Sequence, residues 1–193
     1  MKIFYLLFIV ALISLVAPKR ILKNLGGKKE NNVIILAEDD NLENIRKNAL
    51  MKHNFYRKKH QVGDLVRNSE IEAIAQAYSK KLSSVKGTGH SGNTYNNSPL
   101  GENLYYVWGS YQMTVTGADA TESWYNEVSK YDFNNPGFTS GIGHFTQLVW
   151  KGSKELGCGA SCENNYCAVT CNYFPAGNYL GEFASNVFPA VEL

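Results

Sequence analysis

Apolar side chains recur at helical spacing in the first half of the chain and predict two helices there. The first runs from a cap at Asp40 or Asn41 to about Lys59. Its inner side carries Leu42, Ile45, Ala49 and Phe55 or Tyr56. The second opens at a capping box formed by Ser69 and Glu72. Its inner positions are Ile71, Ile74, Ala75, Tyr78 and Leu82.

A third helix is predicted from about Ala118 to Tyr131, where Trp124 and Val128 share one side. The run Asn-Asn-Pro-Gly at 134–137 ends it. Residues 83–101 are rich in Gly, Ser and Asn and are typical of a long loop, and a last extended segment is expected near 179–183. Helices followed by a short antiparallel hairpin predict an α+β fold built in layers.

The four cysteines all lie between residues 158 and 171. Their C-x3-C-x4-C-x3-C spacing could hold zinc, but the flanking segments 155–162 and 167–173 are typical of two paired strands. In that hairpin opposed residue numbers sum to 329, so Cys158 faces Cys171 and Cys162 faces Cys167. Directly opposed Cα atoms lie about 4.5–5.5 Å apart, within disulfide range. Any other pairing would bridge roughly 13 Å along a strand. Two nested disulfides are predicted.

The N-terminus has the pattern of a secretory signal. Residues 3–16 are apolar except for Ser14, and about 14 residues is too short for the roughly 20 that a spanning helix needs. We therefore expect a signal peptide over 1–17, a polar linker or pro-segment over 18–40, and one domain over 41–193. Secretion also agrees with disulfides.

The charge pattern argues against nucleic acid as a partner. Residues 41–193 carry 13 basic and 13 acidic side chains, so this domain lacks the basic excess that a phosphate backbone requires. The charge is uneven along the chain, because residues 41–86 carry ten basic and four acidic side chains and residues 87–193 carry three and nine. Such asymmetry could steer the protein to anionic surfaces, although a mixed surface is the simpler interpretation.

Four motifs occur in an order that resembles the CAP superfamily of cysteine-rich secretory, antigen five and pathogenesis-related type one proteins. They are His-Asn-Phe-Tyr-Arg at 53–57, Gly-Glu-Asn-Leu at 101–104, Gly-His-Phe-Thr-Gln-Leu-Val-Trp-Lys-Gly-Ser at 143–153 and Ala-Val-Thr-Cys-Asn-Tyr-Phe-Pro-Ala-Gly-Asn-Tyr at 168–179. The resemblance spans about residues 42–188. It implies a three-layer α-β-α sandwich, here with a disulfide-stapled antiparallel hairpin.

By this resemblance four side chains converge in a central cleft: His90, Glu102, Glu127 and His144. His53 is instead expected in a structural turn of the first helix. Two neutral imidazoles, His90 and His144, suit a weakly bound zinc or other divalent cation, and the carboxylates can orient the rings. The alternative is a hydrogen-bonded network that only braces the cleft.

Hydrolysis is a weaker alternative. A His/Glu pair could act as a general base with Ser91 as nucleophile, but the sequence shows no nucleophile-elbow motif and no specific oxyanion arrangement. The family shares no single reaction. An enzyme is therefore not the favoured interpretation.

Lipid binding is the favoured activity. Some members of the family bind sterols through a loop in the region that follows Gly-Glu-Asn-Leu, and some hold fatty acids between helices. Here that region is rich in aromatic residues, and the lipid-contact candidates are Tyr105, Tyr106, Trp108 and Tyr111. Aromatic rings in an exposed loop suit a flat apolar ligand. Alternatively these rings cover the core. The expected partner is thus a sterol or fatty acid, or failing that an extracellular protein on a cell surface, with no spanning segment in the mature chain.

Overall fold

The structure, a computed structural model, describes residues 38–110 and 113–192, with side chains from residue 41 onward. The expected signal peptide at 1–17 and nearly all of the expected linker therefore lie outside the described residues. In chain order the elements are α1 Glu38–Lys59, β1 Val66–Arg67, α2 Ser69–Val85, β2 Thr94–Tyr95, β3 Ser98–Pro99, β4 Gly101–Trp108, α3 Gly117–Tyr125, the 3-10 helix η1 Asn126–Lys130, α4 Gly143–Leu148, β5 Glu155–Glu163, β6 Tyr166–Phe174 and α5 Phe183–Asn186. No helix among them is long and apolar enough to cross a bilayer.

The main sheet has the strand order β1-β5-β6-β4, with β1 parallel to β5 and the other neighbours antiparallel. The predicted hairpin register is confirmed, since Cys158 pairs with Cys171 and Cys162 with Cys167. Both predicted disulfides form, across Cα distances of 4.2 and 4.0 Å. The small hairpin β2-β3 lies within the segment expected to be a loop.

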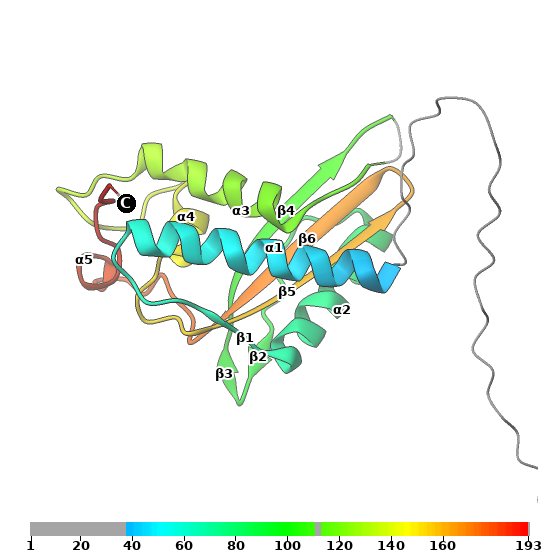
Figure 1. Cartoon of the computed structure of the whole chain (residues 1–193), viewed down its shortest axis with the longest axis horizontal. Coiled ribbons are helices and arrows are strands. Elements are labelled where there is room, and N and C mark those ends of the chain that lie inside the picture. Colours follow the sequence, from blue (N-terminus) through cyan, green and yellow to red (C-terminus); the bar gives the residue numbers. More distant parts are fainter. Residues whose placement is uncertain (1–37, 111–112, 193) are drawn as a thin grey trace, which may run out of the picture. The chain divides into compact units, whose positions relative to one another are not determined.

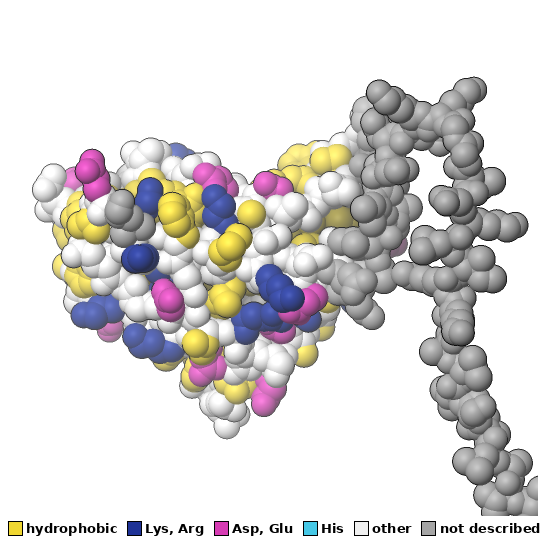
Figure 2. All heavy atoms as spheres, viewed as in Figure 1, with side chains coloured by type: hydrophobic (Ala, Val, Ile, Leu, Met, Phe, Trp, Pro, Cys, Tyr) yellow, Lys and Arg dark blue, Asp and Glu magenta, His cyan; other side chains and the backbone are white. Residues whose placement is uncertain are grey.

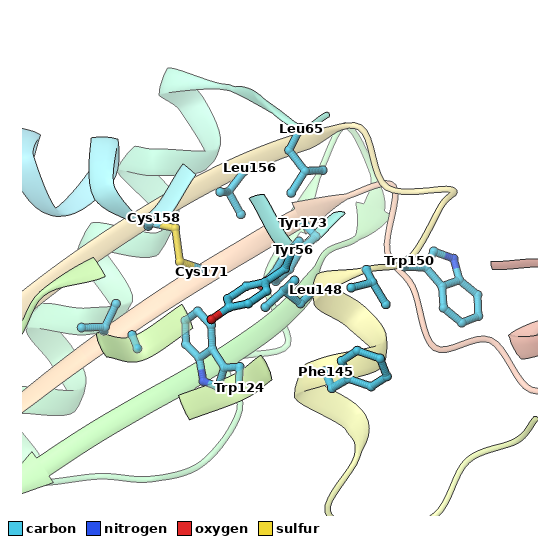
Figure 3. Close-up of a cluster of buried hydrophobic side chains, with 14 of the residues drawn as sticks. Tyr56, Leu65, Trp124, Phe145, Leu148, Trp150, Leu156, Cys158, Cys171 and Tyr173 are labelled. Atoms are coloured by element: carbon cyan, nitrogen blue, oxygen red, sulfur yellow. A yellow bond between two sulfur atoms is a disulfide. The ribbon is translucent and has the colours of Figure 1, made fainter. Parts of the chain in front are cut away.

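Alternation along β6 divides the helices into two layers. Cys171 and Tyr173 point into the main core, which also holds Trp124 of α3 and Phe145 of α4. Intervening residues such as Ala168 point the other way, into a second cluster with Leu82 of α2. In Figure 1, α1 crosses the view in front of β5 and β6, and Figure 3 shows the Cys158–Cys171 bridge among the aromatic rings of the main core. The predicted α-β-α sandwich is confirmed.

Glycines in β5 allow α2 to lie directly against the sheet. A Cβ atom built on Gly157 would come 2.3 Å from the backbone of Ile71, and one on Gly159 would come 2.4 Å from Gln76 Cα. Real side chains do not tolerate such distances, so these two positions require a residue without a side chain. The layer of α2 is thereby fixed at backbone contact.

Four local expectations need correction. The second helix is capped by Asn68, whose side-chain oxygen accepts from the backbone N–H groups of Glu70 and Ile71, and not by Ser69. Glu72 is buried and pairs with Arg67 and Arg46 instead of completing a capping box. The other three concern the exposure of Phe55 and the backbone form of residues 179–183 and 105–108.

Of the pair Phe55 and Tyr56, only Tyr56 is buried, because Phe55 lies a full turn beyond exposed Met51 on the outer side of α1. Residues 179–183 form no strand: a turn leads from 180 directly into α5. The segment 105–108, expected to be an aromatic loop, is the second half of strand β4.

A buried polar chain links the layers around His53. Nδ1 of His53 donates to the carbonyl of Ala49 at 2.7 Å, so Nε2 accepts from the hydroxyl of Tyr173, also at 2.7 Å. The amide of Asn103 on β4 donates in turn to Tyr173 Oη and to the carbonyl of His144, both at 2.9 Å. Burial lowers the pKa of His53 to about 4, which keeps the imidazole neutral at ordinary pH.

This low pKa predicts loss of stability in acid. A histidine whose pKa is lower in the folded chain stabilises it fully above its unfolded pKa of 6.5. That stability is lost as the pH falls from 6.5 toward 4, by about 3 kcal/mol for this group alone. Denaturant unfolding of the wild type and a His53→Gln variant across this interval measures it. The variant should show a clearly shallower decline, and identical slopes would contradict a neutral, buried His53.

Candidate functional site

Glu102, on β4, is the centre of the first histidine–carboxylate pair. Its side chain is only 6% exposed and accepts hydrogen bonds from His90 Nδ1 and from the backbone N–H of Ser91, both at 2.9 Å. The Ser91 hydroxyl and the Asn172 amide donate to its second oxygen. Burial raises the pKa of Glu102, but these donors outweigh burial and hold the pKa below its ordinary value.

His90 is the exposed partner of this pair, with 65% of its side chain accessible. Its hydrogen bond to Glu102 raises the pKa of the imidazole, with burial acting in the opposite direction. Because Nδ1 faces a carboxylate, it must carry a proton, and in the neutral ring Nε2 is left with the lone pair.

The second pair joins His144 at the start of α4 to Glu127 of η1. One carboxylate oxygen accepts from His144 Nδ1 at 2.7 Å, and the other accepts from the backbone N–H groups of His144 and Phe145 at 2.9 and 3.1 Å. Hydrogen bonds from His144 and these backbone groups outweigh burial and lower the pKa of Glu127. The ring of Trp124 stacks against His144 at 6.4 Å between centroids.

The two pairs approach the edge strand β4 from opposite layers. Glu102 shares the face of Leu104, which packs with α2. Burial and the charge of Glu102 together raise the pKa of Tyr78, on α2. His144 comes from the other layer, where Asn103 donates to its carbonyl. Within residues 41–110 and 113–192, no three His, Cys, Asp or Glu side chains are grouped closely enough to share a metal ion.

The serine beside the first pair is not arranged as a nucleophile. Ser91 Oγ donates to Glu102 and accepts from the backbone N–H of Asn93, and His90 Nδ1 bonds to Glu102 rather than to this hydroxyl. A serine nucleophile needs a histidine base in hydrogen-bond contact. Each of the two pairs is therefore an imidazole held in one orientation by a carboxylate.

His53 lies outside both pairs, as expected, and is completely buried. Its motif neighbour Arg57 is buried too, and its guanidinium donates to the carbonyls of Gly63, Leu148, Trp150 and Ser153 at 2.7–3.1 Å. Leu148 is the last residue of α4, and Trp150 and Ser153 lie just after it. The motif therefore positions the helix that carries His144.

The lipid-contact candidates separate into different environments because β4 is a strand. Tyr105 turns into the main core, while Tyr106 packs against the α2 cluster. Trp108 ends the strand with 67% of its surface exposed. Tyr111 lies outside the described residues.

Tyr106 is the middle member of an aromatic row. Its ring stacks on Trp108 at 6.0 Å and on Tyr166 at 6.3 Å between centroids. Tyr166 was not predicted as a site residue, since the sequence places it in the turn of the cysteine hairpin. Pairing of β4 with β6, which sets Trp108 opposite Tyr166, is the signal that identifies it.

A pocket of about 290 Å³ opens beside this row. Its lining residues are Lys86, Thr88, Trp108, Asn165 and Tyr166. The ammonium group of Lys86 donates to Asn165 Oδ1 at 3.0 Å, and Tyr166 donates its hydroxyl proton to the carbonyl of Gly87. Aromatic walls with a cation at the rim can hold a small amphipathic molecule.

Comparison with known proteins places this geometry in a family. The profile of the cysteine-rich secretory protein family, CAP, matches residues 50–173. The Golgi-associated plant pathogenesis-related protein 1 of Homo sapiens is 42% identical over 144 residues, covering 73% of this chain and 90% of that protein. The basic form of pathogenesis-related protein 1 of Nicotiana tabacum is 32% identical, covering 77% and 80%.

Protein PRY2 of Saccharomyces cerevisiae is 40% identical over 72% of this chain, which corresponds to only 39% of that longer protein. Among solved structures, BmVAL-1 superposes with a TM-score of 0.61 at 25% identity, covering 77% of this chain and 84% of that one. NaASP2, solved with Zn²⁺, gives the same score and identity over 80% and 90%. The sandwich, the two histidine–carboxylate pairs and these matches show that the chain belongs to the CAP family of cysteine-rich secretory proteins.

Proposed function

We propose that this CAP protein is secreted and binds a sterol or fatty acid at the pocket beside Trp108. The observation that carries the proposal is the two-thirds exposure of Trp108 next to an open pocket and at the end of a stacked aromatic row. Burial of this exposed ring against a ligand would be favourable by roughly 25 cal/mol per Å² of apolar surface removed from water. A flat apolar ligand stacked on the ring would provide that burial.

The size of the pocket limits what it can enclose. At about 290 Å³ it lies at the lower end of ligand sites, which run to roughly 300–1,000 Å³. Such a site would cover one part of a sterol or fatty acid and leave the rest against the aromatic row. Lys86 would face the polar end of the ligand, and its charge favours a carboxylate over a hydroxyl.

Trp108→Ala should weaken lipid binding about tenfold or more, because it removes the largest exposed ring of the pocket. Tyr179→Ala is the matched control: Tyr179 is also an exposed aromatic and does not line the pocket. Titration with a fluorescent sterol and a fluorescent fatty acid measures both variants. Equal binding by the two variants would contradict the pocket and favour the alternative, a protein ligand.

Lys86→Gln separates the two lipid classes in the same titration. The substitution should weaken binding of the fatty acid and leave binding of the sterol unchanged, since only the fatty acid carries a carboxylate. An equal loss for both ligands would show that Lys86 supports the pocket rather than recognising charge.

A weak divalent-cation site at His90 and His144 is the second function we propose. In each pair Nδ1 is bonded to a carboxylate, which orients the ring and leaves Nε2 to bind a metal such as zinc. The structural neighbour NaASP2 was solved with Zn²⁺. Two imidazoles form an incomplete zinc shell, so only weak, reversible binding is proposed.

Zinc should stabilise the wild type by about 1.4 kcal/mol at a tenfold excess over the dissociation constant, and this should raise the melting temperature. The His90→Ala/His144→Ala variant should lose this effect, and magnesium, which prefers oxygen ligands, should produce none. Differential scanning fluorimetry measures all three. A double variant still stabilised by zinc would show that the metal binds elsewhere.

A further inference from the structure

The outer side of α1 combines lysines with large apolar side chains that no other element of the described residues covers. We define the α1 face as Lys47, Met51, Lys52, Phe55, Lys58 and Lys59. Met51 is 62% exposed and Phe55 46% exposed, one helical turn apart. Figure 2, which views the molecule from the side on which α1 lies in Figure 1, shows basic and apolar side chains interspersed there, with some acidic side chains among them.

Positive charge is concentrated around the exposed ring. The ammonium groups of Lys59 and Lys52 lie 5.0 and 5.9 Å from the centre of the Phe55 ring. Lys52 also pairs with Glu122 at 2.8 Å, and Lys47 approaches Glu43 at 3.6 Å. Lys58 and Lys59 form no ion pair with a carboxylate of the described residues, so their charge is available to a partner.

The face continues beyond the end of the helix. The backbone N–H of Val191 donates to the carbonyl of Lys59 at 2.8 Å, which brings the C-terminal segment alongside α1. In that segment Phe188 lies 5.4 Å below the ammonium group of Lys151. The C-terminal segment that contacts the end of α1 thus carries a second lysine–phenylalanine contact.

We propose that the α1 face docks on an anionic phospholipid bilayer. Lysines bind the phosphate and carboxylate groups of the headgroup layer, while partly exposed Met and Phe side chains enter the boundary with the acyl chains. A soluble polyanion would use the lysines but gain little from Met51. The combination of both side-chain types therefore favours a membrane surface.

This surface is separate from the proposed lipid pocket. Lys86 and Thr88 follow α2, and Tyr166 packs in the α2 cluster, whereas α1 belongs to the opposite layer of the sandwich. Docking through α1 leaves the pocket uncovered. The two proposals can therefore fail independently.

Co-sedimentation of the secreted protein with large vesicles tests the docking surface. Vesicles of phosphatidylcholine with about one third phosphatidylserine should bind the protein at low salt, with affinity falling as salt rises. Vesicles of phosphatidylcholine alone should bind it far less. Equal binding to both compositions would overturn the proposal.

Charge reversal on each side of the molecule locates the contact. Lys58→Glu/Lys59→Glu should reduce binding at least tenfold, at roughly fivefold for each lysine lost near the surface. Lys80→Glu/Lys81→Glu makes the same change in net charge on exposed positions of α2 and should have a much smaller effect. Equal losses in the two variants would overturn the α1 face in favour of net charge, and equal melting temperatures confirm that both fold.

Met51→Ala/Phe55→Ala distinguishes a bilayer from a general polyanion. It should weaken binding to the anionic vesicles but leave binding to heparin unchanged, since heparin offers no acyl layer. Equal weakening for both would overturn apolar insertion, and unchanged vesicle binding would do the same.

Discussion

The guanidinium of Arg57 is the interaction on which the arrangement of this domain depends. A buried charge is costly unless hydrogen bonds replace its hydration. Here four backbone carbonyls accept from it: one in the loop after α1, one at the last residue of α4 and two just after α4. Burial lowers the pKa of Arg57 to about 10. Removing the guanidinium would leave several buried carbonyls without donors at once. The end of α1 and the chain that follows α4 are therefore fixed to each other.

The position of His144 depends on this constraint and on the chain of hydrogen bonds through His53. Asn103 ends that chain, because its amide donates both to Tyr173 Oη in the core and to the carbonyl of His144. Glu127 then meets a ring whose helix is already fixed. The pair at His90 depends on Glu102 and the short loop around Ser91, with no disulfide among the described residues to hold that loop. The two pairs thus share a chemistry but are held by different parts of the fold.

Sequence patterns predicted what depends on local spacing. The spacing of four residues between the cysteines of each strand, together with the register set by the turn, predicted both bridges. Helical periodicity located the three long helical segments of the described residues. Sequence patterns failed where pairing between distant strands determines the local structure. Residues 105–108 are four bulky side chains in a row, and their pairing with β6 makes them a strand. That strand packs Tyr105 against the main core and leaves Trp108 exposed. Tyr166 could not be assigned to the aromatic row without that pairing. The convergence of each histidine with its carboxylate came from family resemblance, since 12 and 17 residues separate the partners.

Lipid binding at the aromatic row is the central claim about this protein, with the α1 face as a means of reaching membranes. Native mass spectrometry of the protein secreted by a eukaryotic host tests the claim most directly. We expect an adduct with the mass of a sterol or fatty acid that exchanges with added lipid. A bare protein that takes up neither ligand would contradict the claim.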